Sequence, residues 1–145
     1  MKANILPKEV FLNLIVCLDD KNGMMFNRRR QSQDKVLRER VLALAGGRLF
    51  MSAYSAKQFG EVTGIVIDDD YALHAGENDF CFAEDKDISL ADVKQLIIYR
   101  WNRHYPSDKR FDFDIAAEGF TLVSSEDFIG NSHPRITEEI YSKKG

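Results

Sequence analysis

The chain of 145 residues is poor in the residue types that mark specialised protein classes. It has two cysteines and three scattered prolines, so a disulfide-stapled scaffold and a Pro-rich linker are both excluded. No apolar run approaches the roughly 20 residues of a membrane span. The first residues also lack the basic and apolar segments of a secretion signal, so we expect a cytoplasmic protein that does not enter a membrane.

Motifs for several kinds of catalysis are missing as well. His74, His104 and His133 are isolated, with no His-x-His or His-Glu-x-x-His spacing, so we predict no metal site. No Gly-x-x-x-x-Gly-Lys phosphate loop occurs, and no Ser-His-Asp or Cys-His arrangement can be argued from the sequence. The sequence by itself therefore does not define a reaction.

The composition that remains is that of an ordinary globular protein. Hydrophobic residues make up 44% and charged residues 30%, and the length suits one domain spanning residues 1–145. Cys17 and Cys81 each lie in a short apolar stretch, which favours small buried hydrophobes over reactive thiols. A disulfide between them is the alternative.

Charge is distributed unevenly along the chain. Residues 28–40 carry six basic and two acidic side chains, for a net charge of +4, whereas residues 61–92 carry ten carboxylates and one lysine, for −9. Such a distribution either solubilises the surface or forms a complementary docking surface for a partner or a second copy of the chain.

The first part of the chain predicts a strand, a loop and a helix. Residues 10–18 form an apolar strand, and residues 19–23 are turn formers that lead into a polar loop reaching Gln33. Ser32 can cap the helix that follows, with Asp34 in its first turn and residues 46–47, two glycines, at its end. One apolar stripe along this helix consists of Val36, Leu37, Val41 and Leu44.

The middle of the chain alternates short strands with short helices. We predict strands at residues 48–51, 64–67 and 80–83, and a brief helix that opens at Ser55 and ends at Phe59. The strand at 64–67 reads as buried and delivers Asp68, Asp69 and Asp70 to its carboxyl end, where open α/β sheets usually bind ligands.

The last part predicts one helical turn and three strands. The turn is at residues 89–92, and the longest apolar strand, at 95–101, is expected to be central, with Trp101 in the core. Residues 119–124 and 136–141 look like an antiparallel pair. The predicted fold class is α/β: a mixed, mostly parallel sheet with a C-terminal antiparallel hairpin and flanking helices.

This order of elements resembles the dihydrofolate reductase family. Residues 22–27, with the aromatic Phe26, look like the family's flexible loop, and residues 131–133 look like part of its closing hairpin. Asp34 resembles the acidic residue that the family uses to hold the pterin ring. The resemblance implies a dihydrofolate reductase-like fold and a small planar ligand near Phe26 and Asp34. Asp34 is a weak candidate catalytic residue whose pKa burial would raise; the alternative is a charge that suits the helix start.

Three departures from the family disfavour its NADPH cofactor. The turn at residues 51–55 lacks the family's Gly-Arg pair, although Ser52, Ser55 and the amides at this helix start could still receive an anion. Asp68, Asp69 and Asp70 would repel a cofactor phosphate by ~1 kcal/mol or more per charge pair. The family's Gly-Gly turn and helix before its penultimate long strand are also missing. We therefore expect a shortened, divergent member without NADPH-dependent reductase activity.

A second interpretation is binding of RNA or another polyanion. Arg28, Arg29 and Arg30 would carry it, with Arg38, Arg40 and the aromatic string around Trp101 in support. The sequence pI of about 5.6 argues against a general nucleic-acid coat. Residues 26–33 and 99–103 are also similar to small bacterial proteins often labelled ribonuclease Z, but that enzyme's His-rich zinc motif is absent. A third interpretation is a protein that associates with itself or a partner.

Overall fold

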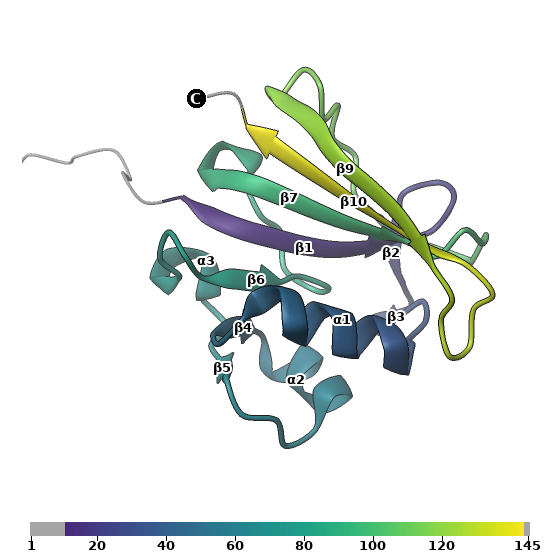
Figure 1. Cartoon of the computed structure of the whole chain (residues 1–145), viewed down its shortest axis with the longest axis horizontal. Coiled ribbons are helices and arrows are strands. Elements are labelled where there is room, and N and C mark those ends of the chain that lie inside the picture. Colours follow the sequence, from purple (N-terminus) through teal and green to yellow (C-terminus); the bar gives the residue numbers. More distant parts are fainter. Residues whose placement is uncertain (1–10, 144–145) are drawn as a thin grey trace, which may run out of the picture.

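A computed structural model describes residues 11–143, and seven strands form its main sheet in the order β5, β4, β6, β1, β7, β10, β9 (Figure 1). The five strands from β5 to β7 run parallel, whereas β10 is antiparallel to both β7 and β9. The predicted mixed sheet with a closing hairpin is thus confirmed. The strands are Leu12–Leu18 (β1), Leu49–Met51 (β4), Ile65–Ile67 (β5), Phe80–Phe82 (β6), Val93–Arg100 (β7), Phe120–Phe128 (β9) and Ile136–Lys143 (β10).

A second, three-stranded sheet lies beside the carboxyl end of β1. It consists of β2 (Gly23–Phe26), flanked by β3 (Arg29–Arg30) and β8 (Lys109–Arg110). The prediction of a polar loop up to Gln33 was therefore wrong. Two residues with positive φ, Asn27 (53°) and Arg28 (61°), connect β2 to β3, the backbone twist that two-residue hairpin turns require.

The helices begin at caps different from those predicted. Helix α1 (Lys35–Ala45) is capped by the Asp34 carboxylate, which accepts from Val36 N and Leu37 N, so Asp34 precedes the first turn and Ser32 is not the cap. Helix α2 (Ala53–Phe59) is capped by Ser52 and starts two residues before the predicted Ser55. The glycine stop of α1 is confirmed, because Gly46 adopts the left-handed conformation with φ of 69°.

Two shorter helical segments complete the main elements. Helix α3 (Tyr71–His74) was not predicted, and the 3₁₀ turn η1 (Leu90–Asp92), capped by Ser89, confirms the single helical turn expected there. The chain therefore has no longer helix between β6 and β7, which matters for the cavity described below.

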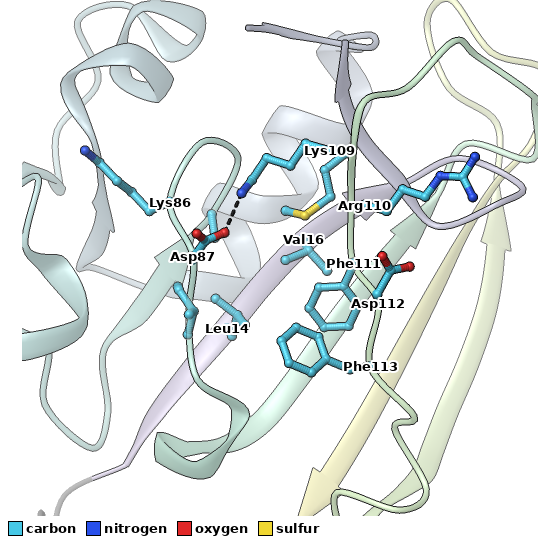
Figure 2. Close-up of a pocket in the computed structure, with 12 residues that line it drawn as sticks. Leu14, Val16, Lys86, Asp87, Lys109, Arg110, Phe111, Asp112 and Phe113 are labelled. Carbon is cyan, nitrogen blue, oxygen red and sulfur yellow. Dashed lines mark hydrogen bonds and ion pairs between the residues drawn. The ribbon is translucent and has the colours of Figure 1, made fainter.

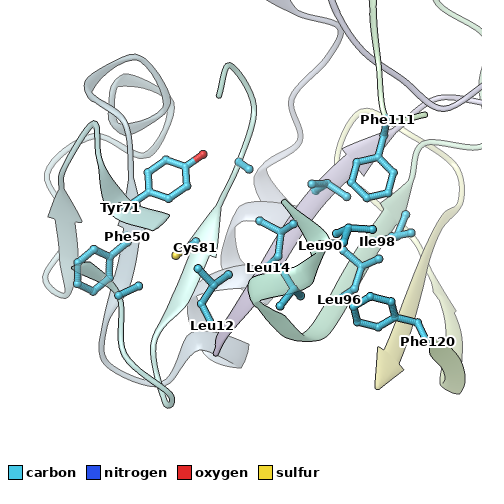
Figure 3. Packing of buried hydrophobic residues seen from close by; sticks show 14 of the residues in the cluster. Leu12, Leu14, Phe50, Tyr71, Cys81, Leu90, Leu96, Ile98, Phe111 and Phe120 are labelled. Atoms are coloured by element: carbon cyan, nitrogen blue, oxygen red, sulfur yellow. The ribbon is translucent and has the colours of Figure 1, made fainter. Parts of the chain in front are cut away.

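The two faces of the sheet bury different side chains. Ile15, Ile97 and Tyr99 pack against Leu37 and Val41 of α1, and α2 covers the same face. On the other face Leu12, Leu14, Val16, Leu96 and Ile98 pack against α3, η1 and the segment before β9 (Figure 3). The side-chain alternation of β1 explains this division, since successive residues of a strand point to opposite faces.

The positions of β5 and β7 in the sheet differ from those predicted. Strand β5 is an edge strand rather than a buried one, and Ile67 is 62% exposed. The middle position belongs to β1, so the strand predicted at 95–101 is interior but not central. Trp101 is buried as expected, both cysteines are free thiols, and Val10 of the first predicted strand lies outside the described residues.

Candidate functional site

The Asp34 carboxylate is buried and saturated with hydrogen bonds. Its Oδ1 accepts from the helix amides of Val36 and Leu37 and from Asn131 N, at 2.9, 3.2 and 2.9 Å. Its Oδ2 accepts from Ser132 N at 2.7 Å, with Ser132 Oγ and His133 Nδ1 at 3.1 and 3.2 Å. Asp34 therefore joins the start of α1 to the loop between β9 and β10.

These contacts reverse the predicted direction of the Asp34 pKa. Burial alone raises the pKa of this carboxyl, but hydrogen bonds from the Asn131 and Ser132 amides, from His133 and from Leu37 stabilise the ionised form. The net result is a pKa well below the ordinary value. A carboxyl with a lowered pKa is a poor general acid near neutral pH, so this pKa does not fit the raised value that a proton-handling role for Asp34 requires.

Asp34, His133 and Ser32 form a chain of hydrogen bonds that the sequence did not reveal. Nδ1 of His133 faces Asp34 and Nε2 faces Ser32 Oγ at 3.1 Å, the connectivity of a hydrolytic triad. Tyr105 Oη is also 2.9 Å from Nε2, and the imidazole stacks on Trp101 with a centroid distance of 4.5 Å.

The cavity beside Ser32 is narrow. A cavity of about 10 Å³ lies between Ser32, Cys17, Arg30, Glu84 and Trp101, the volume of one water molecule at most. Burial raises the pKa of the Cys17 thiol, so this neighbour is no ready nucleophile either. The triad-like chain joins residues 32, 34 and 133, so it links the segment before α1 to the loop between β9 and β10.

Arg30 fills the space on the other side of this small cavity. Its guanidinium donates to both carboxylate oxygens of Glu84, at 3.0 and 3.2 Å, and lies 4.5 Å from the centre of the Tyr54 ring. The side chains of Arg30 and Glu84 are only 19% and 8% exposed. Arg30 is therefore bound within the protein, as is Arg40, whereas Arg28, Arg29 and Arg38 have no carboxylate partner among residues 11–143.

The start of helix α2 also holds acidic side chains of the protein itself. Asp69 Oδ1 accepts from Ala53 N at 3.0 Å, and Asp85 Oδ1 accepts from Ser52 Oγ at 2.8 Å. Ser52 and Ser55 are both buried, and the Ser52 hydroxyl caps Ser55 N. Of the acidic triplet after β5, Asp69 thus reaches the helix start where the family resemblance places a cofactor phosphate.

Phe26 and Asp34, which were predicted to bind one ligand, belong to different elements. It belongs to β2, pairs with Arg29 and is 48% exposed, whereas Asp34 is 1% exposed at the start of α1. Within residues 11–143, no hydrogen bond or ion pair of the Asp34 carboxylate leads to Phe26.

A hollow with aromatic walls lies elsewhere, on the face of the sheet opposite α1. This cavity of about 210 Å³, called the Phe111 cavity below, is lined by Leu14, Val16, Met24, Ala83, Lys86, Asp87, Ile88, Lys109, Arg110, Phe111, Asp112 and Phe113. Figure 2 shows Leu14 and Val16 of β1 at its base and the Phe111 and Phe113 rings on one side. These two rings meet edge to face with centroids 4.8 Å apart. Its walls are thus largely apolar and partly aromatic.

An ion pair crosses the rim of the Phe111 cavity. Lys109 Nζ lies 2.5 Å from Asp87 Oδ1, joining β8 to the loop after β6 (Figure 2). The Lys86 ammonium points away from this pair in the same view. The rim therefore carries charges of both signs above an apolar base.

The length of the chain between β6 and β7 explains the cavity. Residues 83–92 contain only η1, so Leu14 and Val16 of β1 are roofed by side chains of loop residues instead of a helix. The alternating segment at residues 109–113, in which Phe111 and Phe113 are separated by Asp112, was not singled out in the sequence. The alternation of aromatic and charged residues in this segment is the signal that could have predicted one buried and one exposed side.

Other classes of site find no support in the described residues. Between residues 11 and 143, no three His, Cys, Asp or Glu side chains are grouped closely enough to hold a metal ion. Over the same range, no helix has the length and apolar character needed to cross a membrane.

The sheet order, the antiparallel closing hairpin and the helices on both faces define a dihydrofolate reductase-like fold. A solved structure of dihydrofolate reductase from Enterococcus faecalis, in complex with NADP(H) and RAB-propyl, superimposes with a TM-score of 0.62. The match covers 93% of this chain and 97% of the reductase, at 10% sequence identity. At this identity the match shows the fold alone. No family model and no curated protein matches the sequence.

Proposed function

We propose that this protein binds a small planar ligand in the Phe111 cavity and does not catalyse NADPH-dependent reduction. The observation that carries the proposal is an apolar hollow with aromatic walls and a charged rim, the usual composition of a small-molecule site. Its volume of about 210 Å³ is below the roughly 300–1,000 Å³ of most ligand pockets, which favours one or two fused rings.

The acidic side chains at the start of α2 support the second half of the proposal. Asp69 and Asp85 take the Ala53 amide and the Ser52 hydroxyl, groups that an incoming phosphate would need. A phosphate brought beside them would meet ~1 kcal/mol or more of repulsion for each charge pair. In this proposal Ser52, Ser55 and Asp34 stabilise the protein's own loops and helix starts.

Two aromatic residues allow a matched test of where the ligand binds. We would titrate 1-naphthaleneacetamide, a neutral planar compound, and follow it by saturation-transfer NMR. Phe113→Ala removes a wall ring of the cavity and should weaken binding about fivefold, the contribution of one aromatic contact. Phe26→Ala removes an aromatic ring of similar exposure outside the cavity and should leave the affinity unchanged. The reverse result would place the ligand beside Phe26 and overturn the proposal.

NADPH provides the second arm of the experiment. A ligand present at one hundred times its Kd stabilises the folded state by about 2.7 kcal/mol, which raises Tm by roughly 5–10 °C in a domain of this size. We expect NADPH to leave Tm unchanged at millimolar concentration. A shift of several degrees that disappears in high salt would show that the cofactor binds in spite of Asp69 and Asp85.

A further inference from the structure

We propose that the ligand of the Phe111 cavity carries an anionic group, a carboxylate or a phosphate, which Lys109 binds in exchange for Asp87. This inference rests on the proposed function and adds the chemical class of the ligand. It starts from the position of Lys109, whose side chain forms a wall of two neighbouring hollows at once.

The second hollow provides room for a polar substituent. It has a volume of about 350 Å³ and is lined by Met25, Arg28, Tyr54, Asp85, Asp108 and Lys109. Met24 and Met25 are consecutive residues of β2, and Met24 lines the Phe111 cavity whereas Met25 lines the second hollow. Because successive strand residues point to opposite sides, the two hollows lie on either side of β2 and meet at Lys109.

The two carboxylates of the second hollow accept hydrogen bonds from the protein, whereas its arginine donates none to a side chain of the described residues. Asp85 accepts from Ser52 Oγ at 2.8 Å, and Asp108 accepts from Asn27 N at 3.0 Å. Arg28 has neither a carboxylate within 4.0 Å nor a side-chain acceptor among residues 11–143, and the turn that carries it is held by the Asn27 contact to Asp108. Arg28 is exposed, so its guanidinium donors face water, and an anion in this hollow would be a stronger acceptor for them than water is.

The partner that Lys109 holds now is easily replaced. The Asp87 side chain is 97% exposed, so its carboxylate returns to water at little cost when Lys109 leaves it. The Lys109 side chain is only 27% exposed, so its ammonium gains from a new anion at the cavity rim. A planar ligand whose ring lies on Leu14 and Val16 can place an acidic substituent at this point.

Three probes with the same ring system test the inference. 1-Naphthaleneacetate and 1-naphthyl phosphate carry an anion, and 1-naphthaleneacetamide is their neutral counterpart. We expect the better of the two anions to bind about fivefold more tightly than the amide, the advantage of a charge-assisted hydrogen bond at a partly exposed site. Which anion binds more tightly identifies the substituent, and that preference should weaken as salt is raised.

Two variants separate the charge of Lys109 from its packing. Lys109→Met should abolish the preference for the anion, so that the three probes bind with equal affinity. Asp87→Asn removes the competing carboxylate and should strengthen anion binding about threefold, without effect on the amide. Lys94→Met is the matched control, because Lys94 forms an exposed ion pair with Glu77 at 3.9 Å away from both hollows.

The outcomes are distinguishable. If the amide binds and neither anion binds more tightly, or if Lys109→Met weakens all three probes equally, this inference is overturned and the proposed function stands. If none of the three naphthyl compounds binds, the proposed function itself fails. A gain in anion affinity on Asp87→Asn, together with its loss on Lys109→Met, supports the exchange of partners at Lys109.

Discussion

Asp34, between β3 and α1, and Asp87, in the loop after β6, are two carboxylates that differ in burial and in the number of their hydrogen-bond partners. Asp34 is 1% exposed and accepts from four backbone amides. The Asp87 side chain is 97% exposed, and its recorded partner is Lys109. One carboxylate cannot leave its partners without exposing buried donors, whereas the other can exchange its partner freely.

The same contrast extends to the two faces of the sheet. The face under α1 and α2 is closed by helical side chains such as Leu37 and Val41, and its polar loop contacts are satisfied by Asp34 and His133. The face under η1 retains a cavity of about 210 Å³ because loop residues cover it. The resemblance at Asp34 therefore points to the face under α1, whereas the cavity that we propose as the ligand site lies on the face covered by loops.

Removal of the Asp34 carboxylate should have the largest effect. Asp34→Ala leaves several buried amides and the His133 imidazole without an acceptor, so we expect the free energy of unfolding to fall by about 3–5 kcal/mol. Urea denaturation measures this. Asp112→Ala, at an exposed carboxylate of the Phe111 cavity, is the control and should change stability by less than about 0.5 kcal/mol. Similar losses for both variants would contradict the distinction between closed and open regions.

The free energy of unfolding should also depend on acid pH through Asp34. The folded-state pKa of Asp34 lies below its unfolded value of about 3.9, so its contribution is complete above that pH and is lost as pH falls towards the folded pKa. One such group gives a slope of up to about 1.4 kcal/mol per pH unit in this range.

Asp19 contributes in the same acid range. Burial raises the pKa of this carboxyl, but hydrogen bonds from Gly23, Lys21, Tyr105 and Gln31 lower it overall. Urea midpoints at pH 6, 4 and 3 should therefore fall steeply in the wild type and less steeply in Asp34→Asn, with the Asp19 component left in both. Parallel curves for the two proteins would show that Asp34 titrates normally.

The smallest expected effect is that of one added methyl group, whose cost in stability should differ between the two faces of the sheet. Val41→Ile inserts a methyl group into the closed packing under α1 and should cost about 1 kcal/mol or more. Val16→Ile points into the Phe111 cavity, so we expect a change below about 0.5 kcal/mol and weaker binding of the naphthyl probes. Thermal unfolding of the two variants measures the difference. Equal costs would mean that the cavity is closed in solution.

Local pattern was enough to place most of the regular elements. Alternation and β-branched residues located β1, β4, β6, β7 and the β9–β10 pair, and Gly46 located the end of α1. The hairpin of β2 and β3 was missed because its turn is formed by Asn27 and Arg28, and an arginine with positive φ is not an expected turn residue. The prediction of Ser32 as the helix cap was wrong. Asp34 is held at the cap position by the Asn131 and Ser132 amides, which are far away in the sequence.

The fold class could be predicted without the structure, because the periodicity of apolar residues decides which segments become strands and which face of each is buried. The sequence also shows that no zinc-hydrolase spacing is present. Only the tertiary structure decided that Asp34 is saturated, that Asp69 reaches the start of α2, and that Lys109 and Asp87 meet above Leu14. Hydrogen-bond partners and cavities depend on contacts between residues far apart in the sequence, and no local pattern predicts such contacts.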